Sequence, residues 1–159
     1  MFQIPKLVLD INWQETFNDS PNLTDVSIDQ RSMMKTYNFS LKYDNSLNFA
    51  LPKGIRNTQK IYLTLKNLLW NVEGTRDFKN LPIPLEIIAT DLNTGKAKAF
   101  CSGDLAQVIT ASISIPTIFD PVKIEDSYYV DGLLSRNLPV EDAFNLGADI
   151  VIAVDVGTS

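Results

Sequence analysis

The sequence predicts an α/β fold in which helices flank a sheet. In the second half of the chain, segments of strand length alternate with segments of helical periodicity. The first half contains two runs of alternating apolar residues separated by Asp44-Asn45-Ser46, and these predict a β-hairpin excursion. The 159 residues have the length of one modest domain, and 45% of them are hydrophobic, which is enough for a real core.

The elements of the first half begin with an apolar stripe that fits one face of a helix. Its spacing is i, i+3, i+4 and i+7, at Ile4, Leu7, Val8 and Ile11. Residues 14–34 are polar and predict a loop, and the hairpin follows within 37–51. A further helix is expected to begin at Asn57 or Thr58 and to stop at Gly74.

The second half predicts most of the sheet. Leu85–Thr90 and Lys96–Phe100 are expected to be strands joined by the turn Asn93-Thr94-Gly95. Ser102 is expected to cap the helix that follows them. Ser127–Val130 predicts another strand, which leads into the turn Asp131-Gly132.

The last part of the chain predicts a helix and a strand. Pro139 is suited to the first turn of a short helix that ends at Gly147. Asp149–Asp155 then predicts a buried closing strand, because a short apolar run is bounded there by two aspartates.

Composition excludes several kinds of chemistry. The chain has no histidine, so it cannot complete a Ser-His-Asp or Cys-His catalytic group, or a zinc site that needs histidine. Its one cysteine, Cys101, cannot form an internal disulfide. The net charge of −5 argues against general binding to nucleic acid. No apolar run approaches the ~20 residues of a membrane-spanning helix. We expect neither a metal nor a cofactor.

Asp131 is the candidate functional residue on physical grounds. It stands at the end of a predicted strand, where ligand sites in open α/β sheets are found, and a carboxylate there could act as a general base. The plainer interpretation is that Asp-Gly is simply a favourable turn dipeptide. The residues around Asp131 do not by themselves decide between these two interpretations.

The other carboxylates, Asp91, Asp104 and Asp120, are expected to be solvated or to cap helices and turns.

Gly157-Thr158-Ser159 follows the predicted closing strand and could open a nucleophile elbow of G-x-S-x-G form. The second glycine of that motif does not occur, and no complete G-x-S-x-G is present anywhere in the sequence. A polar turn at the end of a strand is the simpler interpretation of this segment.

The order of several motifs resembles that of the bacterial patatin-like phospholipases, which are relatives of neuropathy target esterase. The motifs in the second half are Pro82-Ile83-Pro84, Ile88-Ala89-Thr90-Asp91-Leu92-Asn93-Thr94-Gly95, Ser102-Gly103-Asp104-Leu105, Ala111-Ser112-Ile113-Ser114-Ile115-Pro116, Val130-Asp131-Gly132, Asn137-Leu138-Pro139-Val140 and Leu146-Gly147-Ala148-Asp149. The first half is also similar, in Leu7–Trp13, in Phe17-Asn18-Asp19-Ser20-Pro21 and in Leu51-Pro52-Lys53-Gly54. Each motif is weak alone, but the ordered set is specific and covers nearly the whole chain.

The resemblance implies an α/β lipid acyl hydrolase with a Ser-Asp dyad that needs no histidine and no cofactor. The family's base is the aspartate of a D-G-[GA] motif, which corresponds to Asp131 followed by Gly132. Leu133 departs from this pattern and could re-aim Asp131, and Arg136 stands where asparagine is common. The implied partners are a lipid or ester substrate and, through it, a peripheral membrane contact.

In the family, the nucleophile elbow and the glycine-rich oxyanion loop precede the segment equivalent to Ile4–Trp13. We therefore expect residues 1–159 to form a partial patatin-like domain that lacks the nucleophile strand, its helix and the serine. Such a domain would expose a sheet edge through which it could self-associate. The alternatives are a catalytically inactive remnant or interaction module of the same fold, and an unrelated α/β domain that binds small molecules.

Overall fold

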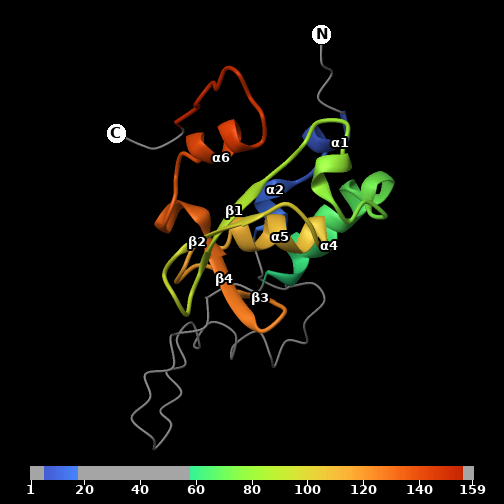
Figure 1. Ribbon diagram of the computed structural model, residues 1–159. Helices are drawn as coiled ribbons and strands as arrows, with labels where there is room; N and C mark the ends of the chain where they lie inside the picture. Colours follow the sequence, from blue (N-terminus) through green and yellow to red (C-terminus); the bar gives the residue numbers. More distant parts are fainter. Residues whose placement is uncertain (1–5, 18–57, 156–159) are drawn as a thin grey trace, which may run out of the picture.

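The computed structural model describes residues 6–17 and 58–155, which form one sheet with helices around it (Figure 1). The helices are α1 (Lys6–Leu9), α2 (Trp13–Thr16), α4 (Gln59–Leu68), α5 (Leu105–Ser112) and α6 (Val140–Asn145). The strands are β1 (Ile87–Asp91), β2 (Ala97–Phe100), β3 (Val122–Ile124) and β4 (Ser127–Asp131). Short 3₁₀ turns are η1 (Trp70–Val72), η2 (Phe78–Asn80) and η3 (Gly132–Leu134). The predicted hairpin within 37–51 lies outside the described residues.

The sheet has four antiparallel strands in the order β2-β1-β4-β3. The predicted hairpin of β1 and β2 is confirmed, with Ile87 opposite Phe100. On its other side β1 pairs with β4, where Ala89 lies opposite Asp131. β3 was not predicted, because its three residues include the exposed Lys123 and are too few for a clear apolar alternation. Four successive residues of β1 are buried, so both faces of the strand are covered, which explains its continuous apolar run.

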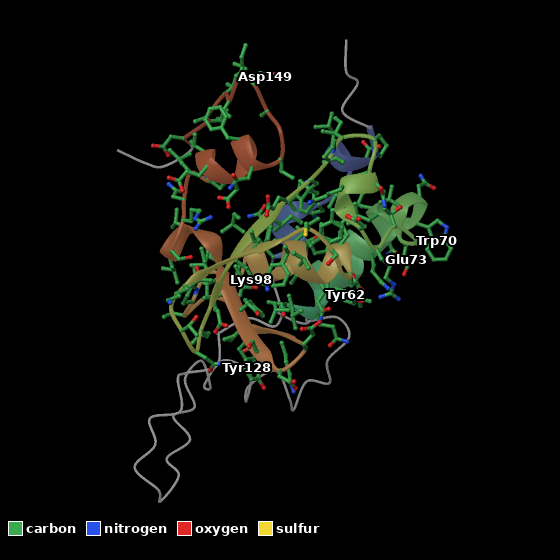
Figure 2. All side chains as sticks on the ribbon, viewed as in Figure 1. Tyr62, Trp70, Glu73, Lys98, Tyr128 and Asp149 are labelled. Carbon is green, nitrogen blue, oxygen red and sulfur yellow. The ribbon has the colours of Figure 1, made fainter. Side chains whose placement is uncertain are left out.

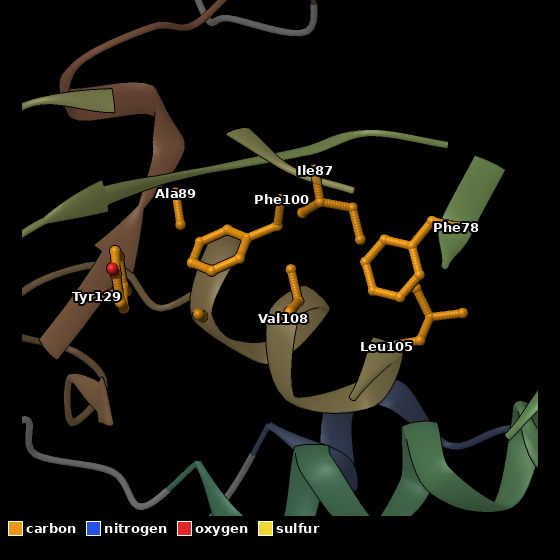
Figure 3. Close-up of a cluster of buried hydrophobic side chains, with 8 residues drawn as sticks. Phe78, Ile87, Ala89, Phe100, Leu105, Val108 and Tyr129 are labelled. Carbon is orange, nitrogen blue, oxygen red and sulfur yellow. The ribbon is translucent and has the colours of Figure 1, made fainter. Parts of the chain in front are cut away.

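The core lies between the sheet and α5, with α4 beyond α5 (Figure 1). Figure 3 shows the aromatic rings of this cluster facing α5. Phe100 and Tyr129 meet edge to face across the sheet, with their ring centroids 5.0 Å apart. Phe78 and Val108 fill the space between the sheet and the helix, and neither exposes more than 1% of its surface. The packing of α5 therefore fixes the position of the β1–β4 pair.

The helix boundaries correct several predictions. Of the predicted N-terminal stripe, Leu7 and Val8 lie in the short helix α1, Ile11 follows it, and Ile4 lies outside the described residues. The helix α2 begins separately after Asn12. Thr58 is the N-cap of α4, but its side chain makes no capping hydrogen bond. The regular helix ends at Leu68 and continues as η1, so it stops before the predicted Gly74. The prediction of Ser102 as the cap of α5 is wrong, because Asp104 directly precedes the helix and its Oδ1 accepts from the Gln107 N–H at 3.1 Å.

The C-terminal segment contradicts the sequence prediction. Asp149–Asp155 forms no strand, and Ile150, Ile152 and Val154 are 83%, 85% and 71% exposed. Figure 2 shows Asp149 beyond α6, away from the sheet. Apolar composition alone does not make a strand, because the backbone groups need a neighbouring strand, and no described strand pairs with this segment. Within residues 6–17 and 58–155, no helix is long and apolar enough to cross a membrane.

Candidate active site

Asp131 is the last residue of β4, at the point where the strand gives way to η3. Its N–H donates to the Ser114 carbonyl at 2.9 Å, so the turn after α5 supports the end of the strand. Ser114 is itself 1% exposed, and its hydroxyl donates to the Thr110 carbonyl at 2.6 Å. Asp131 is half-buried, so its carboxylate is anchored by buried structure and still reaches the surface.

The carboxylate of Asp131 uses one oxygen to hold its own orientation. Its Oδ1 accepts a hydrogen bond from the Leu133 N–H at 2.9 Å, which caps η3. Among the described residues, no donor is within hydrogen-bond distance of Oδ2. One oxygen is thus fixed by the backbone, and the other, to which no described residue donates, can accept a proton.

The Asp131 carbonyl is held from β1. The Thr90 hydroxyl donates to it at 2.8 Å and lies 2.7 Å from the Ser135 hydroxyl oxygen. Thr90 is 5% exposed, whereas Ser135 lies on the surface. Sequence reasoning placed Thr90 in a motif without giving it a role, because only the pairing of β1 with β4 brings it to Asp131.

Gly132 is required by close packing. A Cβ at this position would lie 3.0 Å from the carbonyl carbon of Ile88 and closer still to its oxygen. The same Ile88 carbonyl accepts a hydrogen bond from the Ser112 hydroxyl at 2.6 Å, so it is held in place. Sequence reasoning attributed Gly132 to turn flexibility, whereas the structure shows that the backbone of β1 leaves no room for a side chain.

Leu133 fits the turn without strain. The described residues other than glycine with positive φ are Thr117 and Glu125, so Leu133 does not need a glycine-like conformation. Its N–H donates to Asp131, and its side chain is 58% exposed. Arg136 lies nearby on the surface, where its guanidinium contacts both carboxylate oxygens of Asp142, at 2.5 and 2.7 Å.

The remaining predicted carboxylates lie elsewhere. Asp91 accepts from the Asn93 N–H at 2.8 Å and stabilises its turn, and Asp104 caps α5, as expected of capping groups. Asp120 departs from that expectation, because its Oδ1 is buried and has no hydrogen-bond partner among the described residues. The part of the chain that the structure describes contains no group of three His, Cys, Asp or Glu residues placed to bind a metal. Gly157-Thr158-Ser159 lies outside the described residues.

The described architecture defines an α/β domain in which helices flank one sheet, with an Asp-Gly turn at a strand end. The chain belongs to the patatin-like phospholipase family, because that family's model matches residues 3–144. An NTE family protein of Mycobacterium tuberculosis is 31% identical over 133 residues, which cover 84% of this chain and 33% of the relative.

Two further relatives match shorter stretches. The mouse patatin-like phospholipase domain-containing protein 7 is 32% identical over 92 residues, which cover 55% of this chain and 7% of the relative. A lysophospholipase of Aspergillus niger is 35% identical over 69 residues, which cover 43% of this chain and 4% of the relative. The chain spans about a third of the length of the mycobacterial relative, at 33%.

Proposed function

We propose that this chain supplies the carboxylate of a Ser-Asp dyad in a lipid acyl hydrolase, with Asp131 as the general base. The observation that carries the proposal is the asymmetric carboxylate, in which Oδ1 is held by the Leu133 N–H and Oδ2 has no donor among the residues that the structure describes. Membership of the patatin-like phospholipase family supports lipid esters as the substrate class. The names of two relatives, a phospholipase domain protein and a lysophospholipase, support the same class.

The proposed chemistry uses Oδ2 of Asp131. As a serine hydroxyl attacks the ester carbonyl carbon, Oδ2 accepts the hydroxyl proton and then passes it to the leaving alcohol. Water attacks the resulting acyl-serine, and Asp131 accepts a proton from that water and returns it to the serine. Because the carboxylate accepts the proton directly, the dyad needs no histidine, which suits a chain that has none.

The serine is the missing half of the proposed dyad. No complete G-x-S-x-G motif occurs in these 159 residues, so the proposal assigns the serine and the oxyanion donors to another segment. The purified chain should therefore hydrolyse p-nitrophenyl esters no faster than its Asp131→Ala variant. Turnover that Asp131→Ala abolished would contradict the assignment of the serine.

Contact with a lipid surface is part of the proposal. Leu133 and Leu134, directly after Asp131, are 58% and 60% exposed, which supports apolar contact beside the carboxylate. Self-association through a sheet edge stays a prediction. The edge strands β2 and β3 are short, and β2 carries the exposed Lys98, features that discourage edge pairing.

A chimera tests the catalytic role. The segment of the mycobacterial relative that precedes its match to this chain would be fused to residues 1–159 and assayed with phospholipid, lysophospholipid and p-nitrophenyl esters. Labelling by a fluorophosphonate together with ester hydrolysis would support the proposal. Labelling without hydrolysis of any ester would favour the alternative, a catalytically inactive remnant or interaction module of the same fold.

A further inference from the structure

The hydrogen bonds around Asp131 form a directed chain from the surface to its carbonyl. The Thr90 hydroxyl lies 2.8 Å from the Asp131 carbonyl oxygen and 2.7 Å from the Ser135 hydroxyl oxygen. A carbonyl oxygen can only accept, so the single hydroxyl proton of Thr90 is directed to Asp131. The Ser135 hydroxyl must then donate to Thr90, which sets the order Ser135, Thr90, Asp131.

These bonds fix both peptide planes that flank Asp131. The plane before it is held by the bond from its N–H to the Ser114 carbonyl at 2.9 Å. The plane after it is held by the bond from Thr90 to its carbonyl. With both planes fixed, only the side-chain torsions of Asp131 remain free, and the Leu133 N–H selects them by bonding Oδ1 at 2.9 Å.

Burial makes the Thr90 hydroxyl hard to replace. Thr90 is 5% exposed and sits on the central strand β1, so water is largely excluded from its place. Without this hydroxyl, the Asp131 carbonyl would lose the donor that the structure gives it, and a part-buried acceptor without that donor favours rearrangement of the turn. The position of Thr90 therefore bears directly on the orientation of the carboxylate.

We propose that Thr90, supported by Ser135, is a positioning residue that keeps Oδ2 of Asp131 directed toward the reacting serine. This inference rests on the proposed role of Asp131 as the base. Thr90 contacts no reacting atom and acts through the backbone of Asp131. Ser135 orients the Thr90 hydroxyl by donating to it, so its contribution is the smaller of the two.

Amide hydrogen exchange of the full 159-residue chain, followed residue by residue by NMR, tests the inference. The Leu133 amide reports directly on the carboxylate orientation, because it is bonded to Oδ1. The Phe78 amide, bonded to the Cys101 carbonyl at 2.7 Å in the core, serves as the reference. In Thr90→Val, exchange of Leu133 should become about five- to tenfold faster relative to Phe78, as expected for one lost hydrogen bond.

Two variants separate positioning from general stability. Thr90→Ser keeps the hydroxyl, so the Leu133 exchange rate and the carboxyl carbon shift of Asp131 should stay close to those of the unmodified chain. Thr16→Val is a matched control, because Thr16 is 8% exposed and its hydroxyl donates to the Asn12 carbonyl at 3.1 Å on α2, outside the hydrogen bonds that hold Asp131. It should leave the ratio of Leu133 to Phe78 exchange unchanged.

The outcomes are distinct. An unchanged Leu133 ratio in Thr90→Val, or an equal change in Thr16→Val, would overturn the inference. If Thr90→Val does not fold, Ser135→Ala replaces it, and Leu133 exchange must then rise about twofold or more for the inference to stand. A faster Leu133 amide in Thr90→Val, together with an Asp131→Asn chimera that is fully active, would refute the proposed base while keeping the positioning role.

Discussion

Replacing Gly132 by alanine should destabilise the fold because the new methyl group would meet the backbone of the central strand. It would lie 3.0 Å from the carbonyl carbon of Ile88 and closer to the oxygen, and neither atom belongs to a flexible side chain. Overpacking of this kind costs about 1–3 kcal/mol. The smaller conformational freedom of the unfolded alanine chain offsets about 0.4–1 kcal/mol of that cost. The net loss should be about 1–2 kcal/mol, which lowers the melting temperature by about 2–8 °C.

The matched control for this prediction is Gly74→Ala. No atom of the described residues lies within 4 Å of a Cβ at Gly74, and its φ is not in the left-handed region. Its unfolding free energy should therefore stay unchanged or rise by up to about 1 kcal/mol. Urea unfolding followed by circular dichroism measures both variants. If Gly132→Ala were as stable as Gly74→Ala, the close approach of the turn to β1 would be refuted.

Three further predictions concern the local structure, and each is tested by urea unfolding. Thr117→Gly should raise stability by about 1 kcal/mol, because Thr117 is β-branched with φ 73°, and a fall would contradict the strain. Asp104→Ala should cost about 1–2 kcal/mol by removing the cap of α5, whereas Ser102→Ala should change stability by less than about 0.5 kcal/mol. A larger loss of stability in Ser102→Ala than in Asp104→Ala would restore Ser102 as the cap. Arg136→Asn should cost at most about 1 kcal/mol, less in high salt, because its pair with Asp142 is partly exposed. A loss of stability that is larger than this and does not depend on salt would contradict a weak, solvent-screened ion pair.

The sequence was sufficient to predict the elements whose signal is local. The apolar run in β1 and the turn before β2 identified that hairpin, and the helix expected after Ser102 corresponds to α5. The prediction of a closing strand at Asp149–Asp155 was wrong, because a strand needs a neighbouring strand to pair with, and the local sequence pattern does not reveal one. Ile150 and Ile152 have the composition of a buried strand, yet both are more than 80% exposed at 83% and 85%.

In the candidate site too, features encoded by neighbouring residues were predictable, whereas contacts between residues distant in the sequence were not. The Asp-Gly turn and the order of motifs were enough to single out Asp131. The role of Thr90 was not visible, because it lies 41 positions away along the chain and reaches Asp131 only through the pairing of β1 with β4. The reason for Gly132 was also hidden, since a close backbone contact with Ile88 leaves no pattern in the sequence.

The rate of ester hydrolysis by the chimera with Asp131→Asn tests the central claim most directly. The change keeps the size of the side chain and an oxygen that can accept from the Leu133 N–H, but it removes the carboxylate that accepts the serine proton. We predict a fall in kcat of about 10²–10⁴-fold, the usual contribution of a general base, while Asp149→Asn on the exposed C-terminal segment changes kcat little. A folded Asp131→Asn chimera with kcat equal to that of Asp149→Asn would contradict the assignment of Asp131 as the base.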